Sequence, residues 1–322
     1  MFTHALLTFL VLLLPFQVLH AGPEHTKKKT LLVDGIQREY LVHLPPAYTP
    51  DTPVPLILAF HGGEGTPERF EKAMRFSSLS DENGFIVIYP KAIDGHWNDG
   101  RESKLFADHD KKIDDVKFAM AVYWTMRSTF SIDTTRVFAV GVSNGGMFVQ
   151  RLAIEHAELF AGIASVISSI PEPLKERFHP RAPVSVLFIN GTADPFVPYE
   201  GGAVNFDLFS KLSVLRRKPD RGRVLSTDEA VKLWIAHNGT NSTWLRAKVP
   251  DHEPRDGATT DMFIWSGGQR ETYVTLYKVI GGGHTIPGGS VGIPNRKLFG
   301  NICTDFDASA AIWLFFKFNA RK

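Results

Sequence analysis

A serine between glycines, in the pentapeptide at residues 141–145 (Gly-Val-Ser-Asn-Gly), restricts the fold of this 322-residue chain more than any other feature. An apolar strand is predicted over Arg136–Val142, and a helix is predicted over Gly145–Glu158. Only a sharp turn can join a strand to a helix over so few residues, and small glycines permit the backbone angles and close contacts that it requires. We therefore expect Ser143 to stand exposed above the edge of a sheet.

The rest of the chain alternates between short apolar runs and amphipathic segments, a pattern typical of a mostly parallel sheet. Two N-terminal strands, Thr30–Val33 and Arg38–Leu44, are predicted to form an antiparallel hairpin because Asp34-Gly35 favours such a turn. Further strands are predicted at Val54–Phe60, Phe85–Tyr89, Val184–Asn190 and Glu271–Ile280, and further helices at Pro67–Asn83, Asp114–Thr129, Ser226–Asn238 and Asp305–Phe318. The pattern indicates one α/β domain, with a mostly parallel central sheet, helices on both faces and antiparallel N-terminal strands.

Residues 1–21 are predicted to be a removable secretory signal. The apolar run at residues 5–14 is shorter than the roughly 20 residues that span a bilayer, and a cleavage site follows at Ala21. An N-terminal membrane anchor is the alternative interpretation. Residues 22–29 are predicted to be a flexible tail, and residues 30–322 the α/β domain. We expect a secreted or periplasmic protein without stable membrane insertion after the signal is removed.

The charge and the cysteine content argue against several functions. The formal net charge is only +2, so the composition does not favour a nucleic-acid partner. The single cysteine, Cys303, can form neither a disulfide within the chain nor a zinc site of several cysteines, and we expect a small buried side chain. Motifs for catalytic zinc, EF-hand calcium or nucleotide phosphates do not occur, so neither a metal nor another cofactor is expected. The oligomeric state stays open.

A serine hydroxyl needs a base and an orienting carboxylate before it can act as a nucleophile. The strand at residues 184–190 runs into Asp194, and the strand at residues 271–280 runs into three glycines and His284. Ser143, Asp194 and His284 thus all follow strand ends, in the chain order of the α/β-hydrolase fold. This joint match predicts that fold and a catalytic triad. Taken singly, a turn-forming Asp194 and an ordinary loop His284 are the alternatives.

Two backbone N–H groups are predicted to stabilise the oxyanion. One belongs to Asn144, which begins the helix behind Ser143. The other is expected from Gly62 to Glu64, with Gly63 as the best candidate, because His61-Gly62-Gly63 follows the strand at residues 54–60. His61 itself is expected to be structural, since it precedes this loop.

Other residues near strand ends are weaker candidates. Trp97 follows a strand and is a candidate substrate contact, although a packed loop aromatic is an equal alternative. Asp114-Asp115 could suggest a metal or a second acid, but a helix N-terminus held by carboxylates is the better interpretation. The irregular, basic segment 205–223 is predicted to be a surface insertion, with a substrate-facing lid as the alternative.

Several of these motifs together resemble the polyhydroxybutyrate depolymerase and feruloyl esterase family, from about Lys29 onward. The resemblance rests on the segments His61–Gly63, Asp114–Val116, Gly141–Met147, Asp194–Tyr199, Gly282–His284 and Asp307–Ser309. It implies hydrolysis of carboxylic esters through an acyl-enzyme without a cofactor. It also implies that Ser143 is the nucleophile, His284 the base and then the acid, and Asp194 the orienting carboxylate.

The substrate is less constrained than the reaction. Family members often carry tryptophan two residues after the histidine, where this chain has Ile286, so we expect Ile286 to alter the pocket beside His284. The resemblance favours hydroxycinnamoyl (feruloyl) esters or short hydroxyalkanoate oligomers, with polymeric polyhydroxybutyrate as the alternative. A peptidase of the same fold and a non-catalytic binding protein are rival classes. The complete set of Ser143, Asp194 and His284 argues against a pure binding protein.

Overall fold

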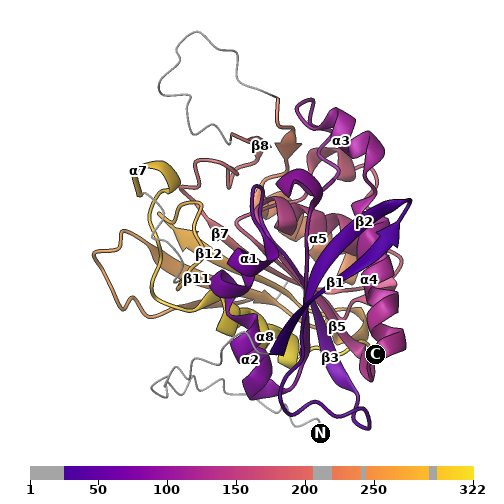
Figure 1. Cartoon of the computed structure of the whole chain (residues 1–322). Coiled ribbons are helices and arrows are strands. Elements are labelled where there is room, and N and C mark those ends of the chain that lie inside the picture. Colours follow the sequence, from indigo (N-terminus) through magenta and orange to yellow (C-terminus); the bar gives the residue numbers. More distant parts are fainter. Residues whose placement is uncertain (1–24, 206–219, 241–243, 290–295) are drawn as a thin grey trace, which may run out of the picture.

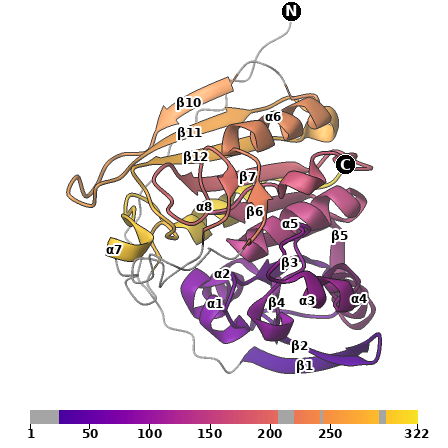
Figure 2. The same cartoon turned by 90° about the horizontal axis from the view of Figure 1, so that it is seen from above.

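The computed structural model describes residues 25–205, 220–240, 244–289 and 296–322. A ten-stranded sheet runs through the described part of the chain, in the order β1-β2-β4-β3-β5-β6-β7-β12-β11-β10 (Figures 1 and 2). Its strands are β1 (Thr26–Val33), β2 (Ile36–His43), β3 (Val54–Phe60), β4 (Ile86–Pro90), β5 (Ile132–Val142), β6 (Gly162–Val166), β7 (Ser185–Gly191), β10 (Trp244–Lys248), β11 (Thr259–Trp265) and β12 (Val274–Ile280). Two short strands, β8 (Gly202–Ala203) and β9 (Arg223–Val224), pair separately.

The centre of the sheet, from β4 to β12, is parallel, and both edges are antiparallel. Figure 2 shows β1 and β2 at one edge and β10 and β11 at the other. The predicted parallel centre and N-terminal antiparallel pair are therefore confirmed. The sequence prediction lacked β6, β10 and β11, because β6 is short and rich in small residues and the other two have no clean alternation of apolar and polar residues.

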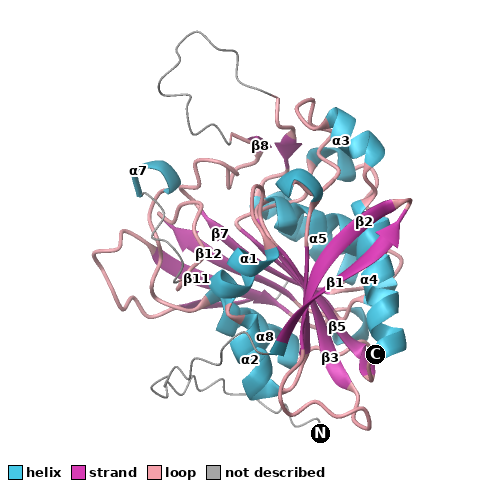
Figure 3. Cartoon of the chain, viewed as in Figure 1, coloured by secondary structure: helices cyan, strands magenta, loops and turns pink. Residues whose placement is uncertain are grey.

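Helices cover both faces of the sheet, as Figure 3 shows in cyan. They are α1 (Pro67–Met74), α2 (Phe76–Asn83), α3 (Ala107–Lys112), α4 (Asp115–Thr129), α5 (Asn144–Glu155), α6 (Thr227–Asn238), α7 (Arg296–Phe299) and α8 (Ala308–Lys317). Helices α4, α5 and α6 pack in one apolar cluster, and α1, α2 and α8 pack in the other. Strand β3 shows why two layers form: Leu56 and Leu58 belong to the first cluster, and Ile57 and Ala59 to the second.

Two local predictions are wrong. Residues 26–29 are not a flexible tail, because Thr26 pairs with His43 in the β1–β2 ladder and its hydroxyl donates to Glu71 at 2.6 Å. The single helix predicted at residues 67–83 is two helices, broken at Arg75, whose φ of 50° is left-handed. An ion pair of the Arg75 guanidinium with Asp307, the N-cap of α8, holds this break in place.

A buried ion pair connects the N-terminal hairpin to α4. The Arg38 guanidinium lies 2.6 Å from Oδ1 of Asp115, with side-chain exposures of 2% and 0%. It also stacks on the ring of Phe118, at 3.9 Å from the ring centroid. The other oxygen of Asp115 accepts from the N–H of Asn98 at 2.8 Å. Asp114 caps α4 as predicted, by accepting from the N–H of Lys117, whereas the Asp115 carboxylate pairs with Arg38 and anchors the loop at Asn98.

The predicted secretory signal, residues 1–21, lies outside the described residues. Within the part that the structure does describe, no helix is both long and apolar enough to cross a membrane.

Candidate active site

Ser143 occupies a strained turn between β5 and α5. Its φ of 54° and ψ of −122° are unusual for a residue with a side chain, and its N–H donates to the carbonyl of Val166 at 2.9 Å. Glycines make the turn possible: a Cβ on Gly145 would lie 2.3 Å from the carbonyl oxygen of His61, and one on Gly141 would lie 2.2 Å from that of Gly145. The turn therefore places the hydroxyl above the sheet, as the pentapeptide predicts.

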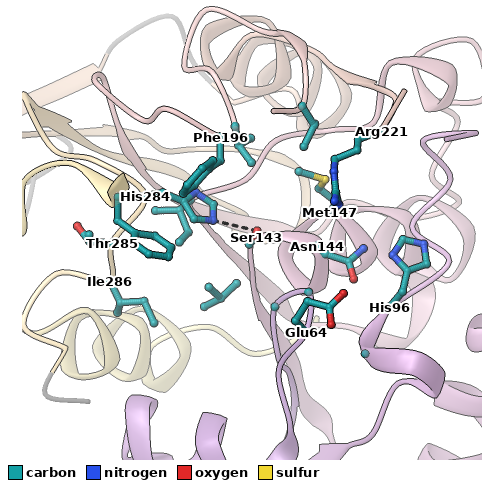
Figure 4. A pocket seen from close by; sticks show the side chains of 18 of the residues that line it. Glu64, His96, Ser143, Asn144, Met147, Phe196, Arg221, His284, Thr285 and Ile286 are labelled. Atoms are coloured by element: carbon teal, nitrogen blue, oxygen red, sulfur yellow. Dashed lines mark hydrogen bonds between the residues drawn. The ribbon is translucent and has the colours of Figure 1, made fainter. Parts of the chain in front are cut away.

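A chain of hydrogen bonds joins Ser143, His284 and Asp194, and Figure 4 shows the bond between Ser143 and His284. Nε2 of His284 lies 3.0 Å from Oγ of Ser143, and Nδ1 lies 2.7 Å from Oδ2 of Asp194. The other oxygen of Asp194 accepts from the N–H groups of Phe196 and Val197, at 2.8 and 2.9 Å. Because Nδ1 faces a carboxylate, the imidazole proton belongs there, which leaves Nε2 free to accept the serine proton.

The loop that carries His284 packs closely against its neighbours. A Cβ on Gly283 would lie 2.1 Å from the carbonyl oxygen of Phe299, and the N–H of His284 donates to that same oxygen at 2.7 Å. The Phe196 ring meets the imidazole edge-on, with the ring centroids 5.3 Å apart. The glycines before His284 thus let the loop approach closely, and packing fixes the imidazole.

Asn144 is held at the start of α5 by its own side chain. Its amide oxygen accepts from the N–H of Trp97 at 2.8 Å. Its amide nitrogen donates to the carbonyl of Trp97 at 3.0 Å and to Asp99 at 2.6 Å. Asp99 in turn binds the guanidinium of Arg101 in a buried ion pair at 2.8 Å. This network fixes the backbone N–H that we predict to face the oxyanion.

The second predicted oxyanion donor lies on the loop after β3. Gly62, Gly63 and Asn144 all line the same cavity as Ser143. The N–H of Glu64 is already used, because it donates to the carbonyl of Gly95 at 2.8 Å. Of the three N–H groups considered, those of Gly62 and Gly63 therefore remain candidates for the second oxyanion donor, and Gly63 remains our prediction.

His61 is structural, as expected, and its hydrogen bonds define its protonation. Nε2 accepts from the backbone N–H of Ala92 at 3.1 Å, so that nitrogen carries no proton. Nδ1 donates to the carbonyl of Gly62 at 2.7 Å. The bond from Ala92 requires the neutral ring, and burial lowers the pKa of His61 to about 4. The neutral imidazole thus anchors the Gly62-Gly63 loop to the loop after β4.

Acid should destabilise the protein through His61. In the unfolded chain its pKa is about 6.5, so between about pH 6.5 and 4 the unfolded state binds more protons than the folded state. The contribution of the neutral His61 to the free energy of unfolding is therefore fully present above about pH 6.5. It falls by up to roughly 3 kcal/mol as the pH is lowered toward 4. Urea unfolding at several pH values should show a shallower pH slope for His61→Gln than for the natural protein. The exposed His179→Gln is the matched control, and equal slopes in all three proteins would disprove the prediction.

Trp97 is not a substrate contact, which corrects the sequence prediction. Its side chain is fully buried, and its indole N–H donates to the carbonyl of His61 at 2.9 Å. The ring stacks on Phe148 and meets Phe60 edge-on. The Trp97 ring therefore fills the space between β3 and α5, and the Trp97 backbone orients the side chain of Asn144.

The cavity at Ser143 has a volume of about 490 Å³ and two chemically different sides. Ile286 lines it, as expected for a residue beside His284. Figure 4 shows Ile286, Thr285 and Phe196 near His284, whereas Glu64, His96 and Arg221 lie on the other side of Ser143. Further lining residues are Arg101, Phe106, Met147, Ile167, Val197, Val204, Phe299 and Ile302.

Several of these lining residues were missed by sequence reasoning. Phe196 had a usable signal, since it follows Asp194 by two residues in the same loop. Met147 also had one, since it lies one helical turn after Ser143 on α5. Arg101 reaches the cavity only through tertiary packing. Of the segment 205–223, which was predicted to be a surface insertion or a lid, residues 206–219 lie outside the described part, and Arg221 lines the cavity.

A mostly parallel sheet, with Ser143 on a strand-to-helix turn and Asp194 and His284 after later strands, defines an α/β-hydrolase. The chain belongs to the esterase PHB depolymerase family. The profile described as "Esterase PHB depolymerase" matches residues 38–170. A protein named "Putative esterase NocK", from Nocardia uniformis subsp. tsuyamanensis, is 31% identical over 283 residues, which cover 85% of this chain and 79% of that protein.

Two further comparisons support the class. "Feruloyl esterase B" of Thermothelomyces thermophilus is 31% identical over 112 residues, or 34% of this chain, and the match spans only 38% of that relative. The solved structure of an acetyl xylan esterase from Aspergillus awamori superposes with a TM-score of 0.53 at 16% identity, over 85% of this chain and 99% of that one. The structural likeness shows a shared fold, and the esterase names describe the relatives.

Proposed function

We propose that this protein hydrolyses carboxylic esters through an acyl-enzyme on Ser143. The observation that carries the proposal is the hydrogen-bonded series from Ser143 through His284 to Asp194, which opens into the cavity. It is also supported by the esterase family to which the chain belongs.

The geometry suggests how each step proceeds. Nε2 of His284 accepts the hydroxyl proton as Oγ attacks the ester carbonyl, and Asp194 stabilises the imidazolium that forms. The N–H groups of Asn144 and Gly63 bind the oxyanion. His284 then protonates the leaving alcohol, and a water molecule, deprotonated by the same imidazole, releases the acid from Ser143.

Bulky acyl groups fit the cavity better than an acetyl group. A volume of about 490 Å³ exceeds what an acetyl group fills, and apolar residues such as Met147, Phe196 and Ile286 form much of the lining. We therefore propose feruloyl (hydroxycinnamoyl) esters or short hydroxyalkanoate oligomers as substrates. Polymeric polyhydroxybutyrate is the alternative.

The test is kcat/KM measured side by side on methyl ferulate, a hydroxybutyrate trimer and an acetylated xylo-oligosaccharide. Preference for ferulate or the trimer is the expected result, and preference for the acetylated sugar would overturn the proposed acyl class. A fluorophosphonate probe should label Ser143 whichever substrate is best. No labelling of the folded protein would overturn ester hydrolysis itself and favour a binding protein.

Export is part of the proposal, because residues 1–21 have the sequence of a secretory signal. Mass spectrometry of protein recovered outside the cytoplasm should find residue 22 as the first. Retention of residues 1–21 in that fraction would instead indicate a membrane anchor.

A further inference from the structure

Two histidines and an aspartate converge behind one wall of the cavity. His96 lines the cavity on the side away from His284, and His109 and Asp110 lie on α3. Each residue offers one ligand atom, and the three atoms lie within 4.8 Å of one another. Two imidazoles and a carboxylate are a ligand set that zinc and related divalent ions bind in proteins.

The imidazoles of His96 and His109 each have one buried nitrogen, Nε2, that makes no well-formed hydrogen bond to any residue that the structure describes. Nδ1 of His109, in contrast, is hydrogen-bonded to Asp110. The His96 side chain is only 4% exposed, and its Nε2 lies 3.3 Å from Oδ1 of Asp110. Nδ1 of His109 lies 3.0 Å from the same oxygen. Since buried polar atoms without partners are destabilising, this cluster has unused capacity to bind a cation.

The three residues are also held in place, as metal ligands need to be. The His96 ring stacks on Phe106, with centroids 3.7 Å apart and planes 9° apart. The backbone N–H of His96 donates to Ile93, and the backbone carbonyl of Asp110 accepts from the side chain of Asn98 at 2.8 Å. Little rearrangement would therefore be needed for binding.

We propose that His96, His109 and Asp110 bind one divalent transition-metal ion, of which zinc is the reference. The ion would connect α3 to the cavity wall at His96. It takes no part in the acyl transfer proposed above, and the inference does not depend on that reaction. Because the histidines must be neutral to bind, protons compete with the metal, and affinity should fall in acid.

Zinc binding should be measured on the whole, chelator-treated protein, by competition with a chromophoric chelator and by metal analysis after dialysis. We expect one zinc ion per chain, a higher unfolding temperature with zinc, and affinity at least tenfold lower at pH 5.5 than at pH 7.5. His109→Gln and Asp110→Asn should each weaken binding at least tenfold. His179→Gln, at an exposed histidine, should bind like the natural protein.

A second buried group, Asp256, Cys303 and Asp305, provides an internal control. Burial raises the pKa of the Cys303 thiol to about 11, which disfavours the thiolate that zinc needs. Both carboxylates there already accept backbone N–H groups. Cys303→Ser should therefore retain zinc binding. Loss of zinc in this variant, or equal zinc binding in His109→Gln and the natural protein, would overturn the proposed site. Circular dichroism in chelator establishes that each variant is folded.

Discussion

Replacing Ser143 by alanine is expected to lower kcat on an ester substrate by roughly 10⁴–10⁶-fold, the range known for the loss of single members of a serine triad. The free energy of unfolding should change little, because the hydroxyl contacts His284 and makes no bond that the fold requires. The measurement is kcat with a chromogenic ester, together with urea unfolding. Ser128→Ala, at an exposed serine of α4, is the matched control and should keep full activity.

Non-additivity separates a triad from independent contributions. If Ser143 and His284 act as one unit, removing the second residue should cost little once the first is gone. The kcat of the double variant Ser143→Ala, His284→Ala should therefore lie within a few fold of the kcat of each single variant. The proposed roles would be ruled out if the loss of kcat in the double variant equalled the product of the two single losses. Substantial turnover by Ser143→Ala alone would rule them out as well.

Replacing Arg38 by methionine is expected to destabilise the protein by about 3–5 kcal/mol, because it leaves the Asp115 carboxylate buried and unpaired. Burial already raises the pKa of Asp115, and Arg38 is the main group that opposes this rise. Without Arg38 the pKa should rise further, so the loss should be largest at neutral pH and shrink as the pH falls and the carboxyl binds a proton. Urea unfolding at pH 7.5 and 5.5 measures both effects.

Two further variants test the cause of that loss. Arg38→Met combined with Asp115→Asn should recover part of the stability, because asparagine is neutral and keeps an acceptor for the N–H of Asn98. Lys28→Met, which removes an exposed partner of Glu39, should change the free energy of unfolding by less than about 1 kcal/mol. A small loss in Arg38→Met, or no recovery in the double variant, would contradict a role for the buried charge.

The sequence predicted the parallel strands of the sheet except β6, because each of the others is an apolar run long enough to be recognised next to a helix pattern. It also predicted that Ser143, Asp194 and His284 would follow strand ends, and the structure brings the three within hydrogen-bonding distance of one another. Strands β10 and β11 were missed because antiparallel edge strands carry a weaker pattern, and their place depends on pairing with β12.

The interior of the site was harder to predict. Trp97 lies in the core because His61 and Phe148 surround it, and all three are far apart in the sequence. Asp99 supports Asn144 across 45 residues, so no local pattern could reveal that contact. Local sequence therefore predicted which candidate catalytic residues lie at strand ends, whereas the shape of the cavity follows from long-range packing.

The strand order has a consequence for how activity arises during synthesis. Strand β12 lies between β7 and β11, although β10 and β11 precede it in the chain. The ribosome thus makes Ser143 and Asp194 long before the strand that carries His284 to them, and the edge strands cannot join the sheet until β12 is in place. A nascent chain would hold Ser143 without His284 beside it, so we expect no ester hydrolysis until synthesis and folding have passed β12.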